Sequence, residues 1–540
     1  MSKIVHASDL TDREKRLLFW ASFLSLVAAG FGFAFRVAMQ GAYGAELGLT
    51  EQQVGEVFGA SLWPIAITMI GFSLVVDRTG YKLPMYGAFA LQTISGIGTW
   101  FAESYQQLYA FALCAGLGHG IVEAVINPIC AAVYPKEKTK WLTYLHAAWP
   151  AGLVGGTLLI LGVDSLVEGG APWRLHAVWI VLPCVAYALM YLPCKFPVDE
   201  RVQAGVPYRE MLQQVGFLTS ALASGLMIYE IGNQVFQLTS LVAADAWVRE
   251  HWFGTAMGLG TAVGVVFGLA VGSLGRPLFF LMCLLMIPVA TAELGTDGWI
   301  KGLMTPVLEG LSINPAMALV YSAGIMLVLR TFAGGILKFF SPPGLLFVSG
   351  IFSAAGLYWL SESVGIAIFV AFTLYALGQT FYWPCVLGFT SERYPQGGAL
   401  TLNTVSAIGL LTAGVVGTPI LGVAFDRSIH ARVESEVPAL AEAATVPGHF
   451  MWMSHEKIDP QLAGQWLESQ PPTERAEAEQ VYSRGTTPGV AQRRAGRDVL
   501  AYATRFPLLL MVVFGAIALW FRMRGGYRPV ELVGHDSGAA

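Results

Sequence analysis

Long apolar runs follow one another along almost the whole chain, and they restrict the fold more than any other feature. They occupy about residues 17–42, 52–76, 83–102, 107–134, 141–162, 173–194, 215–240, 255–274, 277–293, 314–337, 344–360, 364–390, 399–424 and 501–521. One bilayer crossing by a helix requires about 20 apolar residues. The sequence therefore predicts an all-α polytopic membrane protein with about 14 transmembrane helices, six of them before the polar stretch 195–214 and eight after it.

Composition supports a place in the lipid bilayer and excludes several classes of function. Hydrophobic residues make up 55% and charged residues 13% of the 540 residues, whereas soluble proteins carry about 25% charged residues. The net charge of −4 gives no basic field, so we expect no nucleic-acid partner. The six cysteines lie in or beside apolar runs, so we expect neither disulfides nor a cysteine-ligated metal. Phosphate-binding loops and hydrolase motifs are absent from the sequence, so we expect no enzyme activity and no cofactor.

Lysine and arginine residues in the connecting segments predict the orientation. With the N-terminus inside, the inside segments contain 18 of these residues and the short outside loops contain three. Cytoplasmic loops of membrane proteins carry such an excess of positive charge. We therefore expect a multi-pass protein of a bacterial cytoplasmic (inner) membrane, with both termini in the cytoplasm.

The two halves of the chain resemble each other at an offset of about 260 residues. Leu117-Gly118 stands 17 residues before Tyr134-Pro135, and Leu377-Gly378 stands 17 residues before Tyr394-Pro395. The pattern Ala-Gly-x-x-Gly at 151–155 recurs at 413–417. Repeated six-helix halves are a transporter architecture with the substrate site between them, near the middle of the membrane.

The repeat also predicts where the halves differ. If Glu230 lies in the counterpart of the first helix, the second half has about 70 extra residues before its Gly335, and a two-helix hairpin at 255–293 accounts for them. The expected divisions are an N-terminal bundle (1–194), a cytoplasmic linker (195–214), the first part of a C-terminal bundle (215–425), an extracytoplasmic polar insertion with helix-like patches (426–499), and a last helix with a cytoplasmic tail (500–540).

A short turn after the second apolar run carries a recognisable motif. In the segment 71–85, a glycine that allows close helix packing is followed by an acid, an arginine, a turn glycine and a lysine: Gly71, Asp77, Arg78, Gly80 and Lys82. This segment resembles the signature loop of the major facilitator superfamily. The resemblance implies two pseudo-symmetric six-helix bundles, here with the added hairpin, and a gating role for these five residues.

A second, local likeness concerns the fourth helix. Glu123, Asn127 and Pro128 are similar to the Glu and Asn-Pro of the fucose-permease-like branch of that superfamily. That branch has an acidic residue for proton coupling in the first helix, whereas Arg36 is the ionised residue in the first apolar run here.

Ionisable residues inside a span are costly, so they usually face a cavity or a partner. His119, Glu123 and Asn127 are spaced by four residues and share one helix face. Glu123 either titrates in a cavity or is a structural acid held by its neighbours. Arg36 suits a carboxylate or phosphate because its donors form a planar fork, or it only neutralises Glu123.

Other polar residues are candidates for the cavity wall. One stripe in an apolar run is formed by Glu230, Asn233 and Gln237, and further candidates are Gln40, His146, Gln379 and Trp383. Arg330 and Lys338 are interpreted instead as positive anchors at the inner membrane face.

Together these features predict a secondary active transporter of a small polar organic solute, a sugar or an organic anion. We expect it to be coupled to protons, to work by alternating access and to act as a monomer in the lipid bilayer. The alternative is a receptor or assembly protein that keeps the fold without transporting a solute.

Overall fold

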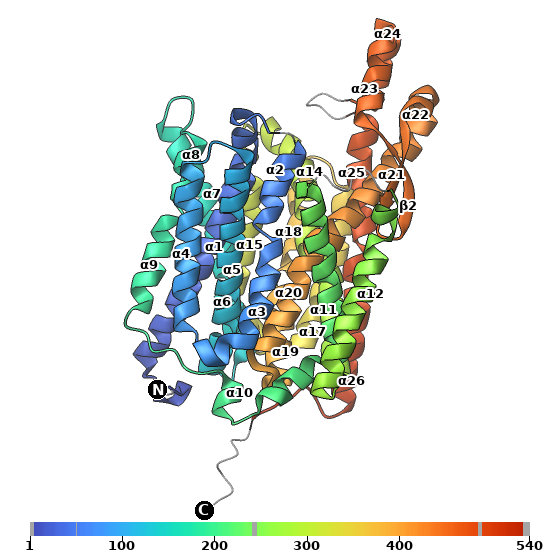
Figure 1. The fold of residues 1–540 in the computed structure, drawn as a ribbon. Coiled ribbons are helices and arrows are strands. Elements are labelled where there is room, and N and C mark those ends of the chain that lie inside the picture. Colours follow the sequence, from blue (N-terminus) through green and yellow to red (C-terminus); the bar gives the residue numbers. More distant parts are fainter. Residues whose placement is uncertain (1–4, 50, 240–245, 484–488, 533–540) are drawn as a thin grey trace, which may run out of the picture.

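The computed structural model describes residues 5–49, 51–239, 246–483 and 489–532. Within these ranges, eleven helices are long and apolar enough to cross a membrane, and the helix at Met317–Thr331 is a shorter apolar one. The chain is therefore an all-α multi-pass membrane protein, as the apolar runs predict. The first described helix begins and the last one ends at the same end of the bundle (Figure 1). We name this the basal end and the opposite one the cap end.

The N-terminal bundle is built from helices that cross between these two ends. After a single-turn 3₁₀ helix η1 (Ala7–Asp9), its helices are α1 (Asp12–Glu46), α2 (Glu51–Ala60), α3 (Trp63–Thr79), α4 (Lys82–Trp100), α5 (Tyr105–Val133), α6 (Lys138–His146), α7 (Ala148–Leu166), α8 (Trp173–Val178) and α9 (Val181–Tyr191). Thr11 begins α1 as an N-cap that accepts a hydrogen bond from the Glu14 backbone N–H. Gly80 ends α3 at φ +67, a conformation that favours glycine.

The C-terminal bundle repeats this pattern after the linker. Its helices are α13 (Pro277–Ala290), η2 (Thr291–Gly295), α14 (Asp297–Gly310), α15 (Met317–Thr331), α16 (Ala333–Ile336), α17 (Pro342–Glu362), α18 (Ala367–Gln379), α19 (Tyr382–Arg393), η3 (Pro395–Gly397), α20 (Gly398–Thr412), η4 (Ala413–Gly417), α21 (Thr418–Glu436) and α26 (Arg505–Met523). The element η2 is a π-helical turn between α13 and α14.

The added helix pair lies earlier in the chain than the expected hairpin at 255–293. After the short helix α10 (Glu200–Gln203), the helices α11 (Tyr208–Thr239) and α12 (Ala246–Val271) pack along each other at one edge of the bundle (Figure 1). In contrast, α13 packs on α20 and α26, just as α1 packs on α7 and α9. The seventh core helix is therefore α13–α14. Placing Glu230 in it was wrong, because the whole insertion precedes the repeat.

Glycine allows the close turn that joins this pair to the core. Gly216 in α11 has φ +55, and the N–H groups of Phe217 and Leu218 donate to the carbonyls of Ser273 and Leu274 at 3.0 and 3.1 Å. A Cβ at Gly216 would meet the backbone of Gly275. The basal turn at 272–276 is therefore held against the start of α11.

Residues 426–483 and 489–499 form a compact unit beyond the cap end of the bundle. Besides the end of α21, it contains α22 (Pro438–Ala444), β1 (Thr445–Phe450), β2 (Met453–Ile458), α23 (Pro460–Ser469), α24 (Pro472–Val481) and α25 (Val490–Ala503). The strands are antiparallel, with Thr445 opposite Ile458. Buried Val433, Leu440 and Ala495 give it an apolar core of its own.

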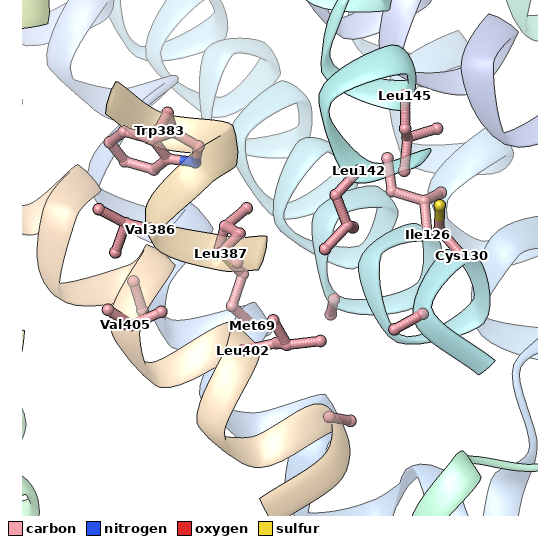
Figure 2. Packing of buried hydrophobic residues seen from close by; sticks show 14 of the residues in the cluster. Met69, Ile126, Cys130, Leu142, Leu145, Trp383, Val386, Leu387, Leu402 and Val405 are labelled. Carbon is pink, nitrogen blue, oxygen red and sulfur yellow. The ribbon is translucent and has the colours of Figure 1, made fainter. Parts of the chain in front are cut away.

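Several helix pairs join the two bundles in the described part of the chain. Helix α3 packs on α20, α7 packs on α15, and α6 packs on α19. Figure 2 shows side chains from α5 and α6 facing those from α19 and α20, among them Leu142 and Leu387, which are fully buried. The apolar core is thus continuous across the boundary between the bundles, close to the polar residues of the candidate site.

Candidate functional site

A hydrogen-bonded chain of buried polar side chains lies on α5 and α6. The side-chain amide of Asn127 donates to Glu123 Oε2 at 2.8 Å, and His146 Nε2 lies 3.0 Å from Asn127 Oδ1. His119 Nε2 lies 3.8 Å from the other carboxylate oxygen of Glu123. Glu123, Asn127 and His146 are all less than 9% exposed. The structure therefore brings together four of the residues that the sequence predicts for the site.

Arg330 extends this cluster across the boundary between the bundles. Its guanidinium donates to the backbone carbonyl of His146 at 3.0 Å, to the carbonyl of Thr380 at 2.9 Å and to Glu293 Oε1 at 3.0 Å. Arg330 is 2% exposed. The interpretation of Arg330 as a surface anchor was therefore wrong, since its side chain points into the protein and is paired there.

Local helix geometry explains where Glu293 lies. It belongs to the π-helical turn η2, which interrupts the regular spacing between α13 and α14. Such single turns are frequent at functional sites, because the extra residue changes which side chains face inward. The turn contacts η4 on the neighbouring helix, itself a π-helical turn. The predicted residues Gln379 and Trp383, both nearly buried, flank the Thr380 carbonyl that binds Arg330.

Arg36 lies in the N-terminal bundle beside a small cavity. Its guanidinium donates to the Gly32 carbonyl at 2.8 Å and to Ser95 Oγ at 3.4 Å. The cavity has a volume of about 10 Å³ and is also lined by Phe33, Gln92 and His119. Within the described part of the chain, Arg36 forms no ion pair with Glu123. In this conformation Arg36 is therefore bonded to uncharged groups and is not the counter-charge of Glu123.

The predicted stripe around Glu230 lies apart from this cluster. It belongs to α11 of the added pair, where Glu230 accepts a hydrogen bond from Gln234 Nε2 at 2.9 Å. Gln234 in turn accepts one from the hydroxyl of Tyr109 at 3.5 Å. Tyr109 and Glu123 lie 14 residues apart on α5, which corresponds to about 20 Å.

Three further candidates, Asn233, Gln40 and Gln237, lie on α11 and α1. Asn233 is half-buried on α11, and Gln40 is half-buried one turn beyond Arg36. The side chain of Gln237 lies outside the described residues.

The signature loop contacts the linker at the basal end. Asp77 forms an ion pair with Arg201, and Lys82 donates to the Leu192 carbonyl at 2.9 Å. Arg78 is exposed, and Gly71 has nothing within 4 Å of an added Cβ, so the expected close helix packing at Gly71 is not found.

A second linker acid holds the start of α20. Asp199 accepts hydrogen bonds from the backbone N–H of Ala399 at 3.0 Å and from the hydroxyl of Tyr81 at 3.1 Å. Burial raises the pKa of Asp199, while a hydrogen bond from the Arg201 backbone N–H opposes that shift. The carboxylate lies at the positive end of the α20 dipole.

Two further contacts join the bundles at the same end. Lys138 forms an ion pair with Glu200 at 2.6 Å, and Thr139 Oγ1 donates to Glu392 at 2.5 Å. Glu392 also accepts a hydrogen bond from Tyr527 at 2.7 Å. These contacts connect the N-terminal bundle, the linker, α19 and the tail, so the protein is closed at the basal end.

This architecture defines a polytopic protein of two repeated bundles with a buried polar site between them. The family described as Major Facilitator Superfamily matches residues 21–418. The chain belongs to this superfamily, whose members are membrane transporters and not enzymes.

Solved transporters show the same fold at low sequence identity. The fucose:proton symporter of E. coli has a TM-score of 0.54 and 12% identity, over 93% of this chain and 98% of that one. The human organic anion transporter MFSD10 has a TM-score of 0.55 and 11% identity, over 93% and 99%. A bacterial homologue of the human lysosomal transporter Spinster has a TM-score of 0.55 and 14% identity, over 96% and 99%.

A curated relative matches a smaller part of the chain. The synaptic vesicular amine transporter of Rattus norvegicus is 22% identical over 266 residues, which is 47% of this chain and 50% of that protein. The chain thus aligns with about half the length of this relative.

Sequence reasoning missed Glu293 and the role of Arg330. Glu293 ends the apolar run at 277–293, and an acid inside a span is itself a signal for a functional site. The repeat offset was a second signal, since Arg36 plus 260 falls at residue 296, three residues from Glu293.

Proposed function

We propose that this protein is a proton-coupled secondary active transporter of a small polar organic solute, and that Glu123 carries the coupled proton. The observation that supports this most is the buried chain from Glu123 through Asn127 to His146, which Arg330 connects to the other bundle. An acid inside a membrane span is costly unless it serves a pathway or a partner.

Protonation would change this chain directly. Ionised Glu123 only accepts hydrogen bonds, whereas a protonated carboxyl group also donates one. The side-chain amide of Asn127 now donates to Glu123, and its oxygen faces His146. A proton on Glu123 therefore weakens the bond from Asn127 and frees the position of His146.

Helix α6 connects the proton site to the basal contacts. His146 is its last residue, and Lys138 and Thr139 at its start bind Glu200 and Glu392. On the other bundle, α19 connects the neighbourhood of Thr380 to Glu392 in the same way. A shift of α6 after protonation would therefore pull on the contacts that close the basal end, which is the step that alternating access needs.

We also propose the orientation and state that the sequence indicates. The basal end would face the cytoplasm of a bacterial inner membrane, since Lys82, Arg276 and Arg393 lie there in a turn or at a helix end. The protein would act as a monomer, because each chain has both bundles.

Transport into liposomes tests the proton role of Glu123. The purified protein is reconstituted with an imposed pH gradient and offered sugars, sugar acids and small carboxylates. The wild type should accumulate at least one of them against its gradient. Glu123→Gln should lose this accumulation and keep exchange, because the amide resembles the protonated acid.

Glu309→Gln serves as the matched control, since Glu309 is an exposed acid at the end of α14 and should tolerate the change. Full pH-driven accumulation by Glu123→Gln would contradict the proton role. If no solute moves in the wild type, the chain is instead a receptor that keeps the fold.

A further inference from the structure

The small cavity beside Arg36 contains a cation without a charged partner. The two groups that accept hydrogen bonds from its guanidinium, the Gly32 carbonyl and Ser95 Oγ, are both uncharged. Among the residues that the structure describes, no carboxylate forms an ion pair with Arg36. An uncompensated charge inside a membrane span is unfavourable by several kcal/mol. A partner that comes from outside the chain would remove this cost.

Gln92 supplies a second unused donor to the same cavity. It is 1% exposed, and its side-chain oxygen accepts hydrogen bonds from Tyr187 at 3.0 Å and from Cys184 at 3.4 Å. Its side-chain Nε2 has no hydrogen-bond partner in the described part of the chain. A buried N–H group without an acceptor is unfavourable, so an acceptor from outside the chain would stabilise it.

Helix α4 brings both side chains to the same cavity. Gln92 and Ser95 are three residues apart and therefore lie on one face of this helix. Ser95 accepts a hydrogen bond from Arg36, and both Gln92 and Arg36 line the cavity. His119, which also lines it, stacks on Trp149 with 5.2 Å between the ring centroids. The cavity thus presents a cation and an N–H donor, with aromatic rings beside them.

The C-terminal bundle has no comparable free charge near the site. The charge of Arg330 is already paired with the carboxylate of Glu293, and its guanidinium also donates to two backbone carbonyls. A second negative charge on a solute would therefore find no free cation there, within the described residues. With Arg36 as the one unpaired cation among these residues, the site suits a solute with one negative charge.

We infer that the cavity lined by Arg36 and Gln92 binds the carboxylate of the transported solute, and that this solute is a monoanionic organic acid. The inference rests on the proposed transport function and specifies its substrate class. A carboxylate matches the planar fork of Arg36 and accepts the free hydrogen bond of Gln92. In this conformation the cavity volume of about 10 Å³ is close to that needed by one water molecule, so the carboxylate enters only when the helices around Arg36 move apart.

Two series of probes that differ in charge test the class. D-glucose, D-gluconate and D-glucarate share a six-carbon skeleton and carry zero, one and two negative charges, and glycerol, glycerate and tartronate do so with three carbons. Binding to the purified full chain is measured by its thermal unfolding and by titration calorimetry. The monoanion should bind at least about tenfold more tightly than the neutral and dianionic members in at least one series.

Arg36→Gln should weaken that binding by about 30-fold or more, as the loss of one partner of a buried charged contact does. Lys338→Gln is the control, because it removes an exposed positive charge and should leave binding unchanged. Gln92→Glu covers the case in which Arg36→Gln does not fold. It places a carboxylate beside Arg36, so it should raise the melting temperature of the free protein and abolish binding of the monoanion.

The inference is contradicted if no monoanion binds the wild type, if neutral or dianionic probes bind as tightly, or if Gln92→Glu binds gluconate or glycerate normally. Failure of the proposed function is a separate result. If gluconate or glycerate binds through Arg36 but no solute accumulates under a pH gradient, the anion site stands and transport fails. If glucose or glycerol is accumulated and no monoanion binds, transport stands and the anion site fails.

Discussion

At the scale of residues, Arg330 is the most heavily bonded charged group of the site. It is buried, and its three acceptors come from α6, from η2 and from the residue after α18. Its bond to the carbonyl of His146 joins the C-terminal bundle to the helix that also carries the basal contacts. One side chain of the C-terminal bundle therefore contacts the helix that carries His146 of the polar cluster.

Glu293→Gln tests the weight of this ion pair. The change leaves a buried guanidinium without its counter-charge, which is expected to destabilise the protein by roughly 3–5 kcal/mol. The double variant Glu293→Leu with Arg330→Met removes both charges and should recover much of that loss. Thermal unfolding in detergent measures both. An unchanged melting temperature in Glu293→Gln would show that the pair contributes little.

Asp77→Asn tests the signature loop. It breaks the ion pair with Arg201, whose side chain is 3% exposed, and so weakens the contact between the linker and α3. Substrate binding should persist while turnover in liposomes falls several-fold, because the basal contacts form in only part of the cycle. Glu531→Gln is the matched control, because Glu531 is an exposed acid in the tail and lies outside the signature loop. Wild-type turnover in Asp77→Asn would remove the gating role.

At the scale of elements, close helix packing depends on a few glycines. The two glycines of the Ala-Gly-x-x-Gly pattern at 151–155 differ in this respect. In the pattern at 151–155, Gly152 lies against α1, where an added Cβ would come within 2.9 Å of the Phe31 backbone nitrogen and 3.0 Å of Gly30 Cα. Gly155 in the same pattern has nothing within 4 Å. Gly152 is therefore needed for helix packing, whereas Gly155 is not, although both belong to the recurring pattern.

Gly152→Ala should destabilise the protein by roughly 1–3 kcal/mol, as overpacking of a tight contact does. Gly155→Ala should leave stability unchanged or slightly higher, because alanine favours a helix. Thermal unfolding of the two purified variants, side by side, provides the comparison. Equal stability of both would show that α1 and α7 tolerate a wider separation.

At the scale of the whole molecule, the added pair α11–α12 lies between the linker and the seventh core helix. The turn at 272–276, which includes Arg276 and joins α12 to α13, lies at the basal end. The molecule consists of two repeated bundles with the cap unit at one end. Contacts between the bundles close the basal end, at the other side.

Labelling at Ser273 tests this topology. Ser273→Cys, in a background without the native cysteines, should react with an impermeant reagent only after the membrane is opened. A cysteine at Trp452, which is 69% exposed in the cap unit, should react in intact cells and serves as the control. Ready labelling of Ser273→Cys from outside would contradict the proposed orientation of the basal end.

Regular patterns made much of this predictable from the sequence. The apolar runs predict the spans, the offset near 260 predicts the repeat, and the spacing of His119, Glu123 and Asn127 predicts a shared face. Their hydrogen bond to His146 depends on how α6 packs on α5, which spacing alone does not give. The position of the added pair was missed because the polar stripe around Glu230 resembled a cavity wall.

Other features depended on contacts between distant segments. In the sequence, Arg330 resembles a positive anchor near the end of an apolar run. Its partners Glu293 and Thr380 are 37 and 50 residues away, so its pairing is visible only in the structure. The β-hairpin of the cap lies between the helix-like patches of the polar segment, where the sequence patterns predict no element. Both cases depend on tertiary packing, to which local patterns are blind.

Proton movement driven by solute is the most direct test of the account. Proteoliposomes that contain a trapped pH-sensitive dye receive an inward gradient of each probe acid or sugar, with no pH gradient imposed. The account predicts that a transported solute acidifies the interior of wild-type liposomes, and that Glu123→Gln moves the same solute without acidification. Solute uptake by the wild type without any proton movement would contradict the central claim.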